Sequence, residues 1–112
     1  MRRGDLVIVS APGGYGKPRP AVIIQSDQLV GTDSVLVALI TSAMVDAPIF
    51  RLTIDPSAQN GLKVPSQVMV DKIVALPRAK CGEVIGQLMA SEITALNALL
   101  AVTVGLADGS GR

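Results

Sequence analysis

The chain has 112 residues and a formal net charge of +1, so it has the length of one domain and lacks the broad positive field that binds long nucleic-acid duplexes. Hydrophobic residues make up 49% of it and charged residues 17%, from which we expect an apolar patch that self-association buries, as in a homodimer. It has no histidine and a single cysteine, Cys81, which argues against histidine acid–base catalysis, an internal disulfide and a zinc site. We expect one domain over residues 1–112, in the reducing cytoplasm.

No segment of the sequence is predicted to cross a membrane. The apolar stretch 93–106 is interrupted by Thr94, Asn97 and Thr103, and it is shorter than the roughly 18 apolar residues that a spanning helix needs. The apolar run 6–9 is too short for the core of a signal peptide.

The first part of the chain predicts three buried strands. Runs rich in valine and isoleucine lie at residues 6–9, 21–24 and 35–40, each bounded by glycine, proline, aspartate or serine. The glycine-rich segment 13–18 predicts a hairpin loop between the first two strands, and 26–34 forms a second loop.

The middle of the chain predicts more short strands. Residues 50–54 alternate between apolar and polar, and the turn-forming segment 55–61 then predicts a hairpin to a strand at 62–64. Pro77 ends the next part of the sheet. Residues 68–70 and 73–76 are predicted to continue the sheet around the charged pair Asp71–Lys72, and residues 83–88 are the last predicted strand.

The C-terminal part changes to helical spacing, which Ile93, Leu96 and Leu100 follow. Ser91 is the predicted N-cap, and Gly105 lies near the C-cap. The small polar tail 107–112 is expected to fray. Many short strands followed by one helix predict a mainly β fold, a small antiparallel and partly closed barrel with a C-terminal helix.

Four segments, in the same order and at similar spacing, resemble the MazF/PemK family of toxin endoribonucleases. They are 4-GDLVIV-9, 18-PRPAVIIQ-25, 37-VALITS-42 and 60-NGLKVPSQVMVDKI-73, and together they cover most of the chain. The resemblance implies an SH3-like barrel and a small cytoplasmic homodimer that cleaves single-stranded RNA (mRNA) at short sequence motifs without a metal or other cofactor. It also implies a cognate antitoxin whose tail occupies the RNA groove.

The chemistry implied by the resemblance needs few groups, because RNA supplies its own nucleophile when the 2′-hydroxyl attacks the neighbouring phosphate. Arg19 would stabilise the added negative charge through its planar fork of donors, aimed by the flanking Pro18 and Pro20. Thr41, at the end of an apolar strand, would donate its hydroxyl proton to the same phosphate. From the residues alone, Arg19 is equally well a surface arginine on a carboxylate, and Thr41 a strand-end threonine bonded to nearby backbone.

Five further residues are candidates for this site. Asp71 matches an acidic position of the family and is a base or, preferably, an orienter of Arg19; a surface salt bridge is the alternative. Lys17 would contact a flanking phosphate and Tyr15 would stack on a base, or both form an exposed hairpin tip. Ser42 and Ser66 are secondary hydrogen-bond candidates.

The first loop departs from the family pattern. Many relatives have a longer segment there with glutamate, glutamine or histidine, whereas 13–18 contains only Tyr15 and Lys17. The group that protonates the leaving oxygen is therefore not assigned.

Two other functions fit the same fold. A CcdB-like toxin would bind a gyrase subunit through its C-terminal helix and cut nothing, and an RNA-binding barrel would bind RNA without forming a product. Arg19 and Thr41 favour the nuclease, because neither alternative needs a cation and a hydroxyl at one phosphate.

Overall fold

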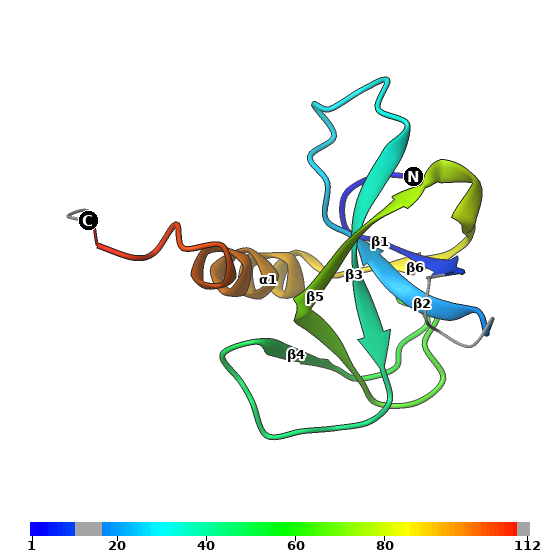
Figure 1. The fold of residues 1–112 in the computed structure, drawn as a ribbon. Coiled ribbons are helices and arrows are strands. Elements are labelled where there is room, and N and C mark those ends of the chain that lie inside the picture. The colour runs from blue at the N-terminus through cyan, green and yellow to red at the C-terminus, as the bar shows by residue number, and fades with distance from the viewer. Residues whose placement is uncertain (11–16, 110–112) are drawn as a thin grey trace.

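Six β-strands and a C-terminal helix make up the structure, a computed structural model that describes residues 1–10 and 17–109 (Figure 1). Every strand pairing is antiparallel, and the strand order β4-β5-β3-β2-β1-β6 leaves β4 and β6 at the two edges. The curved sheet confirms the predicted mainly β, partly barrel-like fold. The elements are β1 Asp5–Val9, β2 Arg19–Ile23, β3 Ser34–Thr41, β4 Arg51–Ile54, β5 Ser66–Pro77, the 3₁₀ turn η1 Arg78–Lys80, β6 Cys81–Gln87 and α1 Ala90–Thr103.

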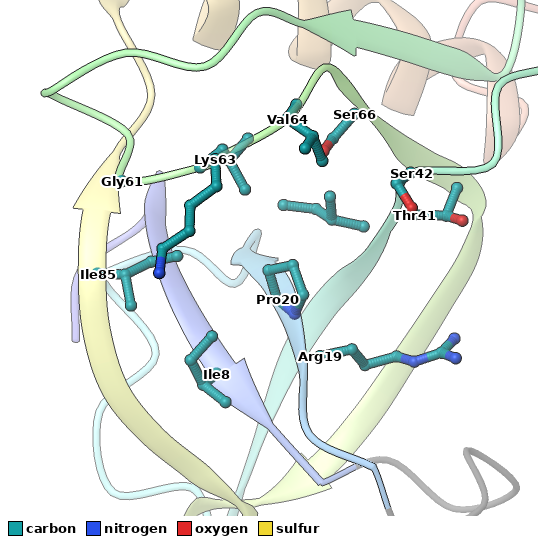
Figure 2. Close-up of a pocket in the computed structure, with 12 residues that line it drawn as sticks. Ile8, Arg19, Pro20, Thr41, Ser42, Gly61, Lys63, Val64, Ser66 and Ile85 are labelled. Atoms are coloured by element: carbon teal, nitrogen blue, oxygen red, sulfur yellow. The ribbon is translucent and has the colours of Figure 1, made fainter.

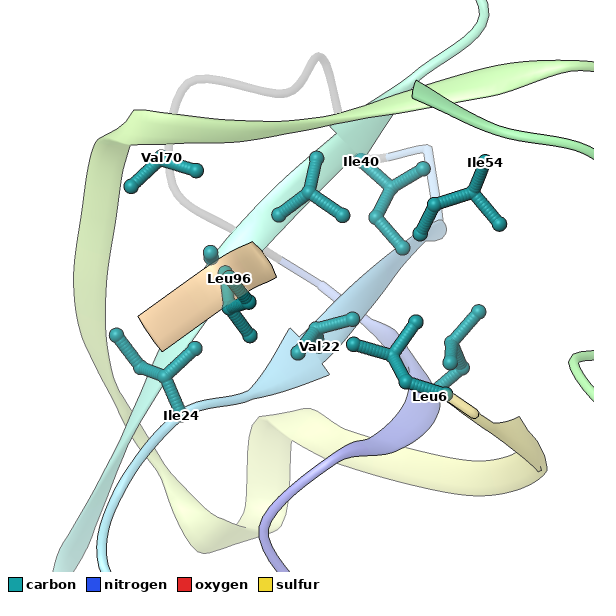
Figure 3. Packing of buried hydrophobic residues seen from close by; sticks show 10 residues of the cluster. Leu6, Val22, Ile24, Ile40, Ile54, Val70 and Leu96 are labelled. Atoms are coloured by element: carbon teal, nitrogen blue, oxygen red, sulfur yellow. The ribbon is translucent and has the colours of Figure 1, made fainter. Parts of the chain in front are cut away.

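The strands supply two clusters of buried side chains, one on each face of the sheet. Successive residues of a strand point to opposite faces, so Leu6 joins one cluster and Val7 the other. Helix α1 covers the first cluster, and its Leu96, which is 0% exposed, packs among Val22 and Ile24 (Figure 3). Burying such a leucine stabilises the fold by about 1.5–3 kcal/mol. The continuous apolar runs of the sequence therefore reflect strands that are buried on both faces.

The start of helix α1 differs from the prediction. Its N-cap is Met89, not Ser91, and the backbone N–H of Met89 donates to Glu92 Oε1 at 2.8 Å. Because the glutamate of the first turn satisfies this N–H, the helix does not need a serine cap. The predicted end is confirmed, since Val104 is the C-cap and Gly105 follows it with φ of 81°. Residues 110–112 of the predicted tail lie outside the described residues.

One strand prediction was wrong, and another is confirmed as a single long strand. Residues 62–64 are not a strand, because the backbone N–H of Leu62 donates to Asn60 Oδ1 at 2.9 Å and the chain runs irregularly into Pro65. The segments 68–70 and 73–76 belong to one strand of 12 residues, β5, in which Asp71 and Lys72 are exposed. Pro77 ends this strand as predicted. Among the described residues, no helix is long and apolar enough to span a membrane.

Candidate functional site

A pocket of about 540 Å³ lies where β1, β2 and β3 meet the segment that leads from β4 to β5 (Figure 2). We call it the Arg19 pocket. Its lining combines an apolar floor with a polar rim. The floor includes Ile8, Pro20, Ile40 and Ile85, and the rim includes Arg19, Thr41, Ser42, Lys63 and Ser66.

Strand pairing brings Arg19 and Thr41 into this one pocket. Strands β2 and β3 pair Ala21 with Leu39, and continuing this register by two residues sets Arg19 opposite Thr41. Directly opposed residues project from the same face, and in Figure 2 the guanidinium and the hydroxyl extend toward the same open side of the pocket. Within the described part of the chain, no carboxylate lies within ion-pair distance of Arg19. Its donors therefore lie at the rim of the pocket, directed away from Pro20 in Figure 2, with no competing acid from these residues.

The hydroxyl of Thr41 is already oriented by the backbone. Its oxygen accepts a hydrogen bond from the N–H of Ala43 at 3.0 Å, which is the local bond that the sequence allowed as an alternative. A hydroxyl has one proton to donate and two lone pairs, so this bond fixes the oxygen and leaves the proton unused. Thr41 can thus donate to an oxyanion in the pocket.

The two predicted serines differ in what they can reach. Ser42 is exposed on the rim of the pocket. Ser66 is 3% exposed, and its hydroxyl donates to the backbone carbonyl of Val64 at 3.0 Å. Ser42 is therefore placed to contact a bound molecule, whereas Ser66 holds the wall of the pocket.

Two other predicted residues, Lys17 and Asp71, do not join the pocket lining, and a third, Tyr15, lies outside the described residues. Lys17 is exposed and precedes β2. Asp71 faces a different partner from the predicted one, since its Oδ1 lies 3.8 Å from Nε of Arg51. The register of β4 and β5 explains this, because Arg51 is paired with Met69, two residues before Asp71. Within the described residues, Asp71 therefore has an ion pair with Arg51, the salt bridge that the sequence allowed as the alternative, and none with Arg19.

A wall of the pocket rests on a buried asparagine that the sequence analysis missed. Asn60 is 2% exposed; its Oδ1 accepts from the N–H groups of Ser57 (3.0 Å) and Leu62 (2.9 Å), and its Nδ2 donates to the carbonyl of Asp55 (2.8 Å). These bonds hold the turn before Lys63 in one conformation. The sequence analysis predicts only a hairpin turn at the Asn-Gly pair. Its position beside an apolar stretch that ends at a proline is the signal that could have indicated a structural role for Asn60.

Two glycines bring this turn against β6. Gly61 has φ of +73°, and a Cβ at this position would lie 2.2 Å from the carbonyl oxygen of Ile85. A Cβ on Gly86 would lie 2.3 Å from the carbonyl oxygen of Gln59. Only glycine fits at either position without moving backbone, so the turn and β6 form one rigid side of the pocket.

A buried glutamine fixes the loop on the other side of Thr41. Gln67 is 5% exposed; its Oε1 accepts from the N–H of Val45 at 3.1 Å, and its Nε2 donates to the Val45 carbonyl at 2.9 Å and to Thr53 Oγ1 at 3.2 Å. The chain that follows Thr41 and Ser42 is thus tied to β5. Paired buried hydrogen bonds of this kind stabilise one arrangement of the loop.

The remaining reactive groups do not form a second site. Among residues 1–10 and 17–109, no group of three or more histidine, cysteine, aspartate or glutamate side chains is placed to hold a metal ion. Burial raises the pKa of the Cys81 thiol above its ordinary value, and the nearby positive charge of Arg78 opposes this only in part. Cys81 is therefore a weak nucleophile, which fits its reading as an ordinary cysteine.

The arrangement in the Arg19 pocket suits a phosphodiester with an attached base. A permanently charged planar donor and an oriented hydroxyl can bind and stabilise an oxyanion, and the apolar floor can accept a flat, partly apolar ring. Two adjacent strands set the spacing of the polar groups, so the pocket is built before any ligand enters.

Comparisons with known proteins agree on one family. The family model described as PemK-like, MazF-like toxin of type II toxin–antitoxin system matches residues 2–104. A protein named probable endoribonuclease MazF from Mycolicibacterium smegmatis is 39% identical over 108 residues, which cover 96% of this chain and 99% of that relative.

Solved structures show the same fold. An endoribonuclease in complex with its cognate antitoxin, from a mycobacterial species, matches with a TM-score of 0.80 at 21% identity and covers 95% of this chain and 96% of that chain. The Mycobacterium tuberculosis toxin MazF-mt6 matches with a TM-score of 0.77 at 27% identity, over 90% of this chain and 96% of that chain.

Proposed function

The chain belongs to the PemK-like, MazF-like family of type II toxins, and on this basis we propose that the Arg19 pocket is the active site of an endoribonuclease toxin that cuts single-stranded RNA at short sequence motifs. The observation that carries the proposal is the placement of Arg19 and Thr41 on neighbouring strands at one pocket. The M. smegmatis relative, which is named as a probable endoribonuclease, supports the class of reaction.

The proposed reaction is an internal transfer within the RNA. The 2′-oxygen forms a bond to the adjacent phosphorus and loses its proton, the bond from phosphorus to the 5′-oxygen breaks, and that oxygen takes up a proton. The products are a 2′,3′-cyclic phosphate and a 5′-hydroxyl. Arg19 stabilises the negative charge that grows on the phosphate oxygens, and Thr41 donates a hydrogen bond to one of them. The substrate supplies the nucleophile, so the reaction needs no metal-bound water.

The other predicted site residues take supporting parts in this proposal. Ser42 and Lys17 contact RNA beside the cut, and Tyr15 stacks on a base. Asp71 has no direct step, because its carboxylate is paired with Arg51; it contributes by holding the β4–β5 side of the site. Ser66 contributes through the Val64 carbonyl that it binds.

A cognate antitoxin is the partner implied for a type II toxin, and we propose that it neutralises this chain in the cytoplasm by covering the Arg19 pocket. The structure of a related fold, an endoribonuclease with its cognate antitoxin, supports the existence of such a complex. The reducing compartment is consistent with the single cysteine.

We also propose that the toxin is a homodimer. The loop between β3 and β4 and helix α1 line a common hollow of about 470 Å³, and both carry exposed apolar side chains. On the loop these are Met44, Val45 and Ile49; Val102 is exposed on the helix, and Val104 and Leu106 follow it. Exposed apolar side chains in this number on a small chain favour self-association. Sedimentation at micromolar concentration is expected to show twice the 11.5 kDa chain mass, and a species of 11.5 kDa alone would contradict the proposal.

The CcdB-like and RNA-binding alternatives predict different outcomes for one assay. We expect purified protein, incubated with a long single-stranded RNA in excess EDTA, to give discrete products that end in a cyclic phosphate. An oligonucleotide spanning a mapped cut is then compared with the same sequence carrying one 2′-deoxy nucleotide on the 5′ side of the cut. The all-RNA strand should be cleaved and the 2′-deoxy strand should not, because it lacks the nucleophile.

Each contrary result has a clear meaning. RNA that is bound but stays intact supports the non-catalytic barrel, and protein that neither binds nor cuts RNA supports a gyrase-type target. Cleavage of the 2′-deoxy strand contradicts the proposed reaction, and cleavage that disappears with EDTA contradicts its independence from metal.

A further inference from the structure

The Arg19 pocket contains a second cation that neither the family comparison nor the proposed reaction uses. Lys63 lines the pocket between Leu62 and Val64, on the segment that connects β4 to β5. In Figure 2 its side chain extends away from Thr41 toward Ile85, whereas Arg19 lies on the other side of Pro20. The two cations therefore flank the apolar floor of the pocket from opposite sides.

The position of Lys63 is fixed by its neighbours in the chain. The hydrogen bonds of Asn60 set the conformation of the turn that precedes it, and the N–H of Gln87 in β6 donates to the carbonyl of Gln59 at 3.0 Å. On the other side, Ser66 binds the carbonyl of Val64. Lys63 is exposed, and no carboxylate of the described residues lies within ion-pair distance of it. A flexible cation thus projects from a rigid base, with its ammonium group open to a ligand.

The floor between the two cations is apolar and can therefore contact the flat ring of an RNA base. Ile8, Pro20 and Ile85 are apolar; in Figure 2 Ile8 and Pro20 lie between Arg19 and Lys63, and Ile85 lies beside the end of the Lys63 side chain. The pocket volume of about 540 Å³ is in the range that holds a small ligand such as one nucleoside. A nucleoside within an RNA strand carries one phosphate on each side, so its charges match a cation at each end of the floor.

We propose that Lys63 binds the phosphate next to the one held by Arg19, and that the base between them lies on the floor formed by Ile8, Pro20 and Ile85. This inference rests on the proposed function, because it divides the same pocket into a reacting position and a neighbouring position. Lys63 takes no part in breaking the bond. It sets which linkage of the strand reaches Arg19 and how tightly the strand is held.

A neutral linkage in the RNA tests this contact directly. An oligonucleotide with a mapped cut is prepared with a single methylphosphonate, which has no charge, at each of the two linkages beside the cut. For the wild type, one of these substitutions should lower kcat/KM about tenfold, because a charge-assisted hydrogen bond is lost. On unmodified RNA, the kcat/KM of Lys63→Met should be about tenfold lower than that of the wild type. The methylphosphonate that slows the wild type should not lower the kcat/KM of Lys63→Met any further. Its kcat at saturating RNA should stay within about twofold of the wild type, since the effect lies in KM.

Salt dependence gives a second measurement on the same variant. RNA with a 2′-deoxy nucleotide at the cut is bound without being cleaved under the proposed reaction. For Lys63→Met, the slope of log Kd against log salt should be flatter by about 0.7, the value for one phosphate contact on a single strand. Lys80→Met, at an exposed lysine outside the pocket, is the matched control and should leave slope and kcat/KM unchanged.

The outcomes separate this inference from the function on which it rests. If the wild type cuts RNA but Lys63→Met behaves like Lys80→Met, or keeps full sensitivity to both neutral linkages, the neighbouring-phosphate contact is wrong and the nuclease stands. If Arg19→Ala cuts as well as the wild type, the assignment of the active site to the Arg19 pocket is wrong, and if no RNA is cut at all, the proposed reaction itself is wrong.

Discussion

Arg19→Ala is expected to lower the rate of RNA cleavage by about 100-fold or more, measured as kcat on a short RNA with a mapped cut. The loss follows because Arg19 is proposed to stabilise charge that exists only in the transition state, and the described residues that line the pocket include no second arginine to replace it. RNA affinity should fall much less than the rate. Arg19→Lys should recover part of the activity, since it keeps the charge but loses the planar fork that matches two phosphate oxygens.

Arg2→Ala is the matched control for charge. Arg2 is exposed at the N-terminus and does not line the pocket, so this variant should cleave within about twofold of the wild type. A rate for Arg19→Ala that equals the rate for Arg2→Ala would show that the guanidinium does not act on the reacting phosphate.

Asn60→Ala is expected to lower the free energy of unfolding by about 2–4 kcal/mol, because it leaves the N–H groups of Ser57 and Leu62 and the carbonyl of Asp55 without their partner. Urea denaturation at one fixed protein concentration measures the change as a lower midpoint with an unchanged slope. The variant should also bind RNA more weakly, since the segment that carries Lys63 loses its anchor.

Asn97→Ala provides the comparison for this result. Asn97 is exposed on helix α1, and alanine is a better helix former, so its stability should stay within about 0.5 kcal/mol of the wild type. An Asn60→Ala variant as stable as Asn97→Ala would mean that water replaces the lost hydrogen bonds and that the turn is not held by this side chain.

Local sequence patterns predicted most of the strands because their signals are strong and short-range. The apolar runs at 6–9 and 21–24 become β1 and β2, and Pro77 ends β5, each through the conformational preferences of the residues themselves. The end of the helix near Gly105 follows for the same reason. The strand predicted at residues 62–64 was wrong, because a mostly apolar stretch has the same sequence pattern whether it pairs with a strand or lines a pocket.

The candidate site could be predicted only in part. Arg19 and Thr41 came from the resemblance, and the register of β2 and β3 brings them into the same pocket. The partner of Asp71 depends on the pairing of β4 with β5, which no local pattern contains. Lys63 was missed for a related reason, since a lysine in this short segment gives no sign that the hydrogen bonds of Asn60 and the backbone contacts of Gly61 and Gly86 fix its place beside the floor.

Gly61 lies close to the backbone of Ile85, and Gly86 lies close to the backbone of Gln59. These two contacts hold the chain between β4 and β5 through its backbone, independently of the side chains that it exposes. Backbone-to-backbone contact fixes the course of the chain here, so the exposed side chains at positions 63 and 64 can be exchanged without altering the path that carries them, whereas Leu62 packs against the core. A gene library randomised at these two codons would therefore keep the architecture while sampling new surfaces toward the substrate. Selecting such a library against defined transcripts offers a route to cleavage enzymes with chosen target sequences.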